Sequence, residues 1–357
     1  MKKYAILITF LALVVVFKSC KKDDEVLPYE PTPYDLVIPS GLPQMPIPAN
    51  NPLTEEGVEL GRRLFYDERL SSDNSMSCAT CHSPGMNFTD TNQFSMGVTG
   101  QSGTRNSMPL INLGWQQFFF WDGRVSSLEE QALHPVINPI EMNEKWPNVI
   151  QKLEEDPYYP EMFRKAFGDR GIDSVKCGKA IAQFVRTLIS GNSKFDKYLR
   201  GEVALTPDEL AGHELFNRDK DEANMISGGD CFHCHGGSLF TDNLFHNNGL
   251  DAVFTDLGRG FITGNPNENG KFKSPTLRNI ELTFPYMHDG RFQTLDDVIN
   301  HYSTGLQNSP TVDPLMKFVA DGGVALTTQE KNQIIAFLKT LTDYDFANNP
   351  AYQDPGY

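Results

Sequence analysis

The sequence predicts a mainly α-helical protein built from two similar domains, and three observations support this class. The chain has 357 residues, which is enough to fill two hydrophobic cores. One motif of cysteines and histidine occurs twice, as Cys78-Ala-Thr-Cys81-His82 and as Cys231-Phe-His-Cys234-His235. A segment with helical signals precedes each copy at a similar interval, so the second half of the chain repeats the first.

The two helices expected before the motifs have matching features. Thr54 and Thr206 are predicted to cap their N-termini, because a threonine side chain can accept a hydrogen bond from the first helical turn. Gly61 and Gly212 occupy equivalent positions inside them. Since glycine lowers helix stability, each is expected to mark a close contact with another helix. For the second copy, the expected partner is the last helix of the chain, at residues 329–341.

The chemistry of each motif predicts covalent haem. Two cysteines separated by two residues and followed directly by histidine are typical of c-type haem attachment. The thiols add to the haem vinyl groups, and the imidazole binds the iron. A zinc site is the alternative, but its cysteine pairs usually lie roughly 15–20 residues apart, whereas Cys78 and Cys231 are about 150 residues apart. The other two cysteines, Cys20 and Cys177, stand alone, so no disulfide framework is indicated.

The composition is that of a soluble globular protein, with 39% hydrophobic and 22% charged residues. The formal net charge of −15 argues against nucleic acid as a partner, because nothing would neutralise the phosphates. The acidity fits either simple solubility or electrostatic attraction of a basic electron donor.

Residues 1–19 resemble a bacterial lipoprotein signal peptide, with a basic start, a short apolar run and a small residue before Cys20. Cys20 would then carry the lipid anchor. An ordinary cleaved signal and an uncleaved anchor are the alternatives, and each predicts an exported protein. We therefore expect a periplasmic or outer-membrane lipoprotein of a Gram-negative bacterium.

The predicted organisation after the signal has four parts. Residues 20–52 are rich in proline and are expected to form an extended tether. An N-terminal haem domain is predicted at 53–204, a C-terminal haem domain at 205–345, and a tail at 346–357.

Function depends on which iron keeps an open face, because an iron with protein ligands on both faces only transfers electrons. No histidine occurs between His82 and Trp121. Met86, Met96 and Met108 are possible ligands, but each lies in an expected loop. The first haem is therefore expected to be open or bound by water.

Several further motifs accompany the two haem sites. They are Arg105-Asn106, Phe120-Trp121-Asp122-Gly123-Arg124, Glu130-Gln131-Ala132, Asn138-Pro139-Ile140-Glu141-Met142, Phe245-His246-Asn247, Pro275-Thr276-Leu277-Arg278-Asn279 and Pro285-Tyr286-Met287-His288-Asp289-Gly290. Together they are similar to the motifs of the di-haem cytochrome c peroxidase / MauG family, and the resemblance covers residues 53–342, in order. It implies that each domain resembles a class I cytochrome c, that the first haem reacts with peroxide, and that the second delivers electrons.

The resemblance assigns roles near the first haem. Glu141 matches the distal acid–base, which moves a proton between the two oxygens of peroxide. Gln131 matches the distal amide that holds the ligand. Trp121 matches the tryptophan between the haems and is expected to relay electrons.

The resemblance also implies a calcium ion between the domains. Asn106 matches its side-chain ligand, while Thr283 and Pro285 match its backbone carbonyl ligands, and such oxygen donors suit calcium. Taken alone, these three positions indicate no metal.

The sequence departs from the peroxidases at two places. The loop around Val98 lacks the histidine that blocks the active haem in many of them, so reductive activation is expected to be unnecessary. Tyr302 stands where those peroxidases have a methionine ligand of the second iron, as in the MauG branch. Tyr302 is the favoured ligand, with Met316 and His301 as alternatives, and a phenolate would lower the haem potential.

These observations predict an enzyme that reduces hydrogen peroxide to water. Electrons would come from a small donor protein, a cytochrome c or a cupredoxin, through the second haem. One alternative is a MauG-like oxidase that acts on a partner protein, which Tyr302 favours. The other is a di-haem electron carrier or redox sensor without enzymatic activity. A homodimer is also expected from the family.

Overall fold

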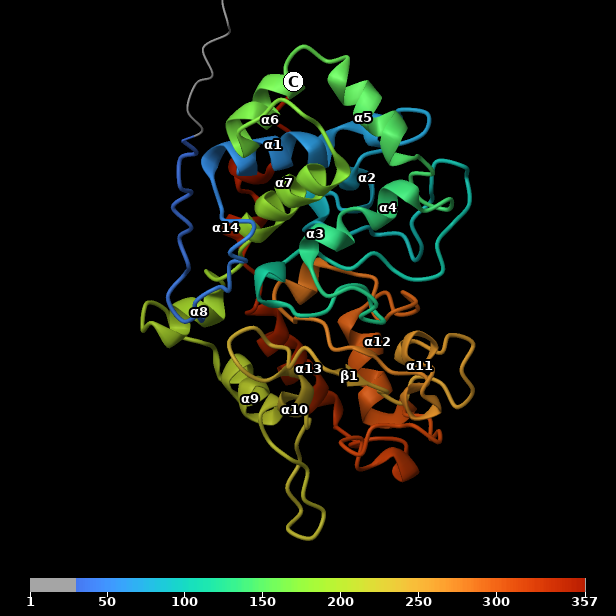
Figure 1. Cartoon of the computed structure of the whole chain (residues 1–357). Helices are drawn as coiled ribbons and strands as arrows, with labels where there is room; N and C mark the ends of the chain where they lie inside the picture. Colours follow the sequence, from blue (N-terminus) through green and yellow to red (C-terminus); the bar gives the residue numbers. More distant parts are fainter. Residues whose placement is uncertain (1–29, 357) are drawn as a thin grey trace, which may run out of the picture.

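The computed structural model describes residues 30–356, and all structural statements below concern this part of the chain. The predicted mainly α-helical class is confirmed. The strand pair β1 (Phe245–His246) and β2 (Phe272–Lys273) is antiparallel and short. The chain forms two lobes, with its first half in the upper lobe and most of its second half in the lower lobe (Figure 1).

The helices of the first lobe follow one another in chain order. They are α1 (Glu55–Tyr66), α2 (Cys78–Cys81), α3 (Leu128–Gln131), α4 (His134–Ile137), α5 (Trp146–Glu154), α6 (Tyr159–Phe167) and α7 (Ser174–Thr187). The remaining helices are α8 (Lys194–Leu199), α9 (Pro207–Phe216), α10 (Phe232–His235), α11 (Arg259–Thr263), α12 (Leu295–Asn300), α13 (Thr328–Lys339) and α14 (Tyr344–Ala347). A π-helical turn at residues 301–305 continues α12.

Local capping explains where the two opening helices begin. The Thr54 side chain accepts a hydrogen bond from the backbone N–H of Gly57 at 3.0 Å, at the start of α1. At the start of α9, Thr206 and Glu209 form a reciprocal capping box. Both predicted caps are confirmed.

The paired glycines mark close helix crossings, as predicted. A Cβ atom on Gly61 would lie 1.9 Å from the backbone oxygen of Ala180, so α1 crosses α7 with no room for a side chain. A Cβ atom on Gly212 would lie 1.8 Å from the backbone oxygen of Gln333, so α9 crosses α13 in the same way. The predicted partner of α9 is therefore confirmed. These two crossings give the lobes similar frameworks around separate hydrophobic cores.

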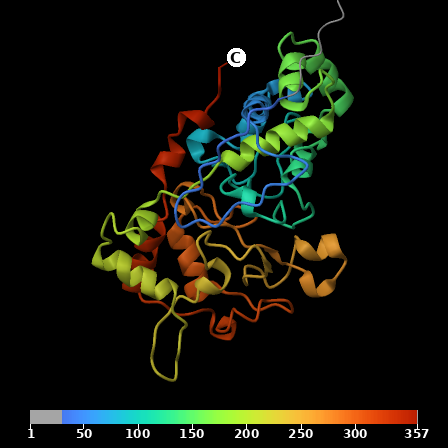
Figure 2. The same ribbon diagram turned by 60° about the vertical axis from the view of Figure 1, so that its left-hand side comes forward.

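The segments at both ends of the described chain pack onto the first lobe. Residues 30–52 are extended and lie against it: the Trp115 indole N–H donates to the Pro43 carbonyl at 3.0 Å, and Met45 is buried beside Trp115. At the other end, the Phe346 and Tyr352 rings pack on Phe88. The red C-terminal segment accordingly returns to the upper lobe (Figure 2). The predicted domain limits stay a prediction, although Phe195 of α8 already packs into the second core.

Polar side chains join the lobes. Arg105 forms ion pairs with Asp122 of the first lobe and with Asp256 of the second, the latter at 2.7 Å. On another part of the interface, the buried Asn279 donates a 2.8 Å hydrogen bond to the Asn87 side chain. Such bonds hold the two motifs in a defined relative position.

The predicted signal peptide and Cys20 lie outside the described residues. Within residues 30–356, no helix combines the length and the apolar character that a membrane crossing requires.

Candidate active site

The two cysteine–histidine motifs have the same local geometry. In the first, Nδ1 of His82 lies 3.2 Å from the backbone oxygen of Phe88. In the second, Nδ1 of His235 lies 3.2 Å from the backbone oxygen of Phe240. A carbonyl at Nδ1 fixes the orientation of the ring and leaves Nε2 as the metal-binding atom. Each histidine is therefore oriented as an iron ligand.

The surroundings of both motifs fit a c-type haem. Burial lowers the pKa of His82 and of His235, which favours the neutral imidazole that binds iron. Burial also raises the pKa of the Cys78 thiol and of the Cys231 thiol, each to about 12. Both cysteines are half-buried, so their thiols would be accessible to the vinyl groups of a bound haem.

A cavity opens beside the second motif and extends to the domain interface. Its wall includes Cys231, Cys234 and His235, as well as residues of the first lobe. The candidate ligands Tyr302 and Met316 both line it. Further lining residues are Asn106, Pro109, Trp121, His246, Asn248, Phe272, Lys273, Thr283, Pro285, Tyr286, Met287 and His288.

Tyr302 lies in the π-helical turn after α12 and accepts a 3.2 Å hydrogen bond from the Asn248 side chain. Burial raises the pKa of Tyr302 to about 12, so the phenol is neutral unless a cation lies beside it. The alternative His301 is held elsewhere, because its Nε2 lies 3.1 Å from the backbone oxygen of Asn248. Tyr302 and Met316, which both line the cavity, thus stay the candidate ligands of the second iron.

Glu141 lies near the first motif with its carboxyl group largely shielded from water. Burial raises its pKa, while a 2.7 Å hydrogen bond from the Asn138 side chain opposes the shift. Burial raises the pKa of the Cys78 and Cys81 thiols, and the charge of Glu141 adds to this effect. The N–H of Val98 donates to the Glu141 carbonyl at 2.8 Å, so the loop after the motif is attached to this segment.

The other residues predicted around the first haem are positioned by separate elements. Gln131 is half-buried at the end of α3. Trp121 is buried, and its indole N–H donates to the Asn106 carbonyl at 2.8 Å. Among the candidate methionine ligands, Met86 and Met96 are 44% and 62% exposed, which is unsuitable for a buried iron. These exposures argue against Met86 and Met96, whereas the third candidate, Met108, is half-buried, so the open first haem stays a prediction.

The three residues predicted to bind calcium are brought together although they are distant in sequence. Asn106, Thr283 and Pro285 line the same cavity at the domain interface. The Asn106 amide N–H group donates to the carbonyls of Asn92 and Gln93 at 3.2 and 3.3 Å, which orients its side chain. An asparagine oxygen and backbone carbonyls are a donor set that fits calcium.

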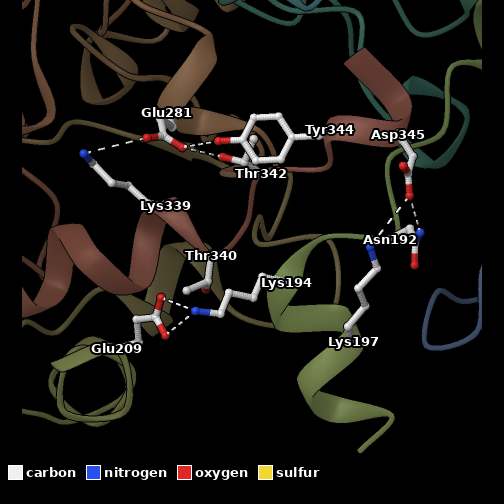
Figure 3. Close-up of a pocket in the computed structure, with 10 residues that line it drawn as sticks. All are labelled: Asn192, Lys194, Lys197, Glu209, Glu281, Lys339, Thr340, Thr342, Tyr344 and Asp345. Atoms are coloured by element: carbon white, nitrogen blue, oxygen red, sulfur yellow. Dashed lines mark hydrogen bonds and ion pairs between the residues drawn. The ribbon is translucent and has the colours of Figure 1, made fainter. Parts of the chain in front are cut away.

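A surface groove between α8, α9, α13 and α14 contains none of these residues (Figure 3). Each of its lysines faces a carboxylate, so the charges in the groove are balanced internally. The pairs are Lys194 with Glu209 at 2.6 Å, Lys197 with Asp345 at 3.7 Å and Lys339 with Glu281 at 3.7 Å.

Comparison with known proteins agrees with this arrangement. The family model described as di-haem cytochrome c peroxidase matches residues 55–204. The methylamine utilization protein MauG of Methylophilus methylotrophus is 36% identical over 303 residues, covering 83% of this chain and 85% of that protein. Cytochrome c551 peroxidase of Nitrosomonas europaea is 36% identical over 311 residues, covering 86% of each protein. The chain belongs to the di-haem cytochrome c peroxidase and MauG family.

Solved structures support the same family. A MauG-like protein associated with microbial copper homeostasis has 35% sequence identity and a TM-score of 0.82, over 90% of this chain and 99% of that one. The di-haem peroxidase BthA from Burkholderia thailandensis, at 22% identity and a TM-score of 0.71 over 85% of this chain and 91% of that one, shares the fold. The predicted pair of cytochrome c-like domains is confirmed. As a family member, the chain is an oxidoreductase of the cytochrome-c peroxidase type with two c-type haems.

Sequence reasoning missed two polar side chains at this centre. Asn138 was recognised only as part of a motif, although it donates to Glu141. Lys273 gave no signal, because a lysine side chain normally points to solvent.

Proposed function

We propose that this protein reduces hydrogen peroxide to water at the haem attached to Cys78 and Cys81. The observation that carries the proposal is the shielded carboxyl group of Glu141 beside that motif, held by Asn138 at 2.7 Å. The overall reaction consumes one peroxide, two electrons and two protons and yields two waters. The bound iron would supply the redox chemistry.

Glu141 and Gln131 have separate roles in the proposed reaction. In the proposed mechanism, Glu141 accepts a proton from the inner oxygen of peroxide and returns it to the outer oxygen, which leaves as water. Burial raises the pKa of Glu141 above the ordinary carboxyl value, so its carboxylate is a stronger proton acceptor. The amide of Gln131 would orient the peroxide.

Electrons would pass between the domains through Trp121. This residue is buried, belongs to the first lobe and lines the cavity of the second motif. Its position at the boundary between the two lobes, where its carbonyl accepts from the Lys273 backbone N–H, supports this role. A small external donor protein, a cytochrome c or a cupredoxin, would reduce the second haem, and the net charge of −15 favours a basic donor.

The substitution Glu141→Gln tests the proposal. It keeps the shape of the side chain but removes the proton-accepting carboxylate, so peroxide turnover should fall by about 10²–10⁴-fold. The haem content and the absorption spectra should stay unchanged. Glu154→Gln is the matched control, because Glu154 is an exposed carboxylate of the same domain. Equal turnover in the wild-type protein and Glu141→Gln would remove Glu141 from the mechanism.

A MauG-like reaction is the second candidate, in which electrons come from residues of a partner protein. Tyr302, which lines the cavity beside the second motif, favours it. MauG of Methylorubrum extorquens is also 38% identical over 302 residues, covering 83% of this chain and 81% of that protein. Steady peroxide consumption with a small donor protein in the absence of any protein substrate would exclude this candidate as the main activity.

Further parts of the proposal concern the setting of the enzyme. Asn106, Thr283 and Pro285 would hold a calcium ion, which their shared cavity and oxygen donors support. Export to the periplasm, a lipid on Cys20 and a homodimer are proposed on the sequence alone, and the corresponding N-terminal residues are outside the described part. Mass spectrometry of the purified protein would detect a lipid on Cys20.

A further inference from the structure

Lys273 is a buried lysine at the interface between the two lobes. It lies on β2 and is 2% exposed. Its ammonium group donates to the backbone oxygen of Phe118 at 3.0 Å and to the side-chain oxygen of Gln116, both in the first lobe. Both acceptors are uncharged, and no carboxylate among residues 30–356 forms an ion pair with Lys273.

Burying such a lysine costs free energy of desolvation. Lysine is almost never fully buried unless its charge is paired, because desolvation disfavours the ammonium form. Here burial lowers the pKa of Lys273 to about 7, with no carboxylate to oppose the shift. A neutral hydrogen-bond donor would join the lobes without this cost of desolvation, so a bridging role alone does not explain a lysine at this position.

The position of Lys273 relates it to the electron path. Its side chain lines the cavity of the second motif together with Cys234 and His235. Its backbone N–H donates to the Trp121 carbonyl at 2.8 Å. A positive charge at this position would favour the reduced form of a haem in the cavity, because reduction removes one positive charge from the iron.

The other charged groups around Lys273 have fixed partners. On β1, His246 lies between Asp242 and Asp313, at 2.8 and 2.7 Å. On α11, Arg259 donates to the Gly123 carbonyl at 2.7 Å. At the same interface, the guanidinium of Arg105 pairs with the carboxylates of Asp122 and Asp256, and Arg124 also pairs with Asp122.

His288 is a further titratable group beside β2, and the centroid of its ring lies 3.6 Å from that of Phe272 in a stacked arrangement. Burial lowers the pKa of His288, which keeps it neutral. Lys273 is thus a buried group of this interface without a charged partner, and burial lowers its pKa to about 7.

We propose that Lys273 is a proton-exchanging group that sets the reduction potential of the haem attached to Cys231 and Cys234. Lys273 would take up one proton from solvent on reduction of the bound haem and would release it on reoxidation. Gln116, which accepts a hydrogen bond from the Lys273 ammonium group, is half-buried. The proposal rests on the two haems of the family and holds whether or not peroxide is the substrate.

The test is a spectroelectrochemical titration of the second haem in the holoprotein at about pH 6 and about pH 8, on either side of the lysine pKa of about 7. Lys273→Met removes the charge, Lys273→Gln removes it but keeps a hydrogen-bond donor, and Lys273→Arg keeps it at both pH values. Lys339→Met is the control, because it removes a charge from a lysine of the same lobe that is 54% exposed.

The wild-type potential should be clearly higher at the lower pH. In Lys273→Met and Lys273→Gln it should be lower than in the wild type at the acidic pH, with a smaller dependence on pH. Lys273→Arg should have a high potential at both pH values, and Lys339→Met should follow the wild type. Unchanged potentials in both uncharged variants, with only a lower melting temperature, would overturn the proposal in favour of a structural role. The titration uses no peroxide, so its result is independent of whether Glu141→Gln lowers peroxide turnover.

Discussion

The side-chain amide of Asn138 donates a 2.7 Å hydrogen bond to Oε1 of Glu141, three residues further along the chain. Burial and this bond act on the carboxyl group in opposite directions: burial raises its pKa, and the bond favours the ionised form. The balance between them determines the pH at which Glu141 can accept a proton.

Replacing Asn138 should therefore move the pH dependence of turnover. In Asn138→Leu the ionised carboxylate loses a donor, so the pKa of Glu141 rises further. The acidic limb of the pH–rate profile should move to higher pH, because turnover needs the carboxylate form. The matched control is Asn148→Leu, which removes a 2.9 Å hydrogen bond to Glu144 in the same domain. Identical profiles for the wild-type protein and Asn138→Leu would contradict the assignment.

Tyr302→Phe should change the second haem. If the phenolate binds the iron, its loss removes a ligand that stabilises the oxidised state, so the potential should rise and the low-spin signal in the electron paramagnetic resonance spectrum should change. Tyr286→Phe serves as the control, because Tyr286 lines the same cavity while its hydroxyl donates to the Ile280 carbonyl at 2.9 Å. An unaltered spectrum in Tyr302→Phe would show that Tyr302 is not the iron ligand and would favour Met316 instead.

The buried pair of Arg278 and Asp196 should dominate the pH dependence of stability in the second lobe. Their atoms approach to 2.9 Å, with side chains 2% and 7% exposed. Removing one partner of such a pair costs about 3–5 kcal/mol, because the other charge stays buried. Asp196→Asn should therefore lower the free energy of unfolding by about this amount at neutral pH.

The sign of the pH effect follows from the pKa of Asp196, which the Arg278 guanidinium lowers against the effect of burial. The stabilisation is present above the unfolded-state pKa of about 4 and is lost as the pH falls through the folded-state value. The difference between the wild-type protein and Asp196→Asn in urea denaturation should thus shrink in acid. A difference that is constant with pH would show that the ion pair is not its cause.

Gly212→Ala should destabilise the protein although alanine is the better helix former. The new Cβ atom would lie 1.8 Å from the Gln333 oxygen, so α9 and α13 would have to separate. Overpacking of this kind costs about 1–3 kcal/mol, against about 1 kcal/mol gained in helix propensity. A lower melting temperature is expected, and a higher one would mean that the crossing adjusts freely.

Calcium should stabilise the domain interface. If Asn106 binds the ion, added Ca²⁺ should raise the melting temperature of the wild-type protein, and a chelator should lower it. The melting temperature of Asn106→Leu should change with neither Ca²⁺ nor the chelator. Mg²⁺ is the control ion, because it requires a tighter octahedral arrangement. Equal responses of the wild-type protein and Asn106→Leu to Ca²⁺ would place the ion elsewhere.

The sequence by itself determined the features that depend on short stretches of chain. The two cysteine–histidine motifs, the caps Thr54 and Thr206 and the internal repeat are all defined within a few residues, because haem attachment and helix capping are local. The crossings at Gly61 and Gly212 were also predictable, since a glycine inside an otherwise stable helix needs a compensating contact. Glu141, Trp121 and Tyr302 could be singled out only through the family resemblance.

Only the tertiary structure decided which polar groups are removed from water and what they meet there. Lys273 contacts Phe118 across a separation of 155 residues, and its position between the lobes follows from the packing of both domains. The same holds for Asn106, Thr283 and Pro285, which come together in one cavity from distant segments. Burial and long-range electrostatics depend on the whole arrangement of the chain, so the pKa values of Glu141 and Lys273 became accessible only with the fold.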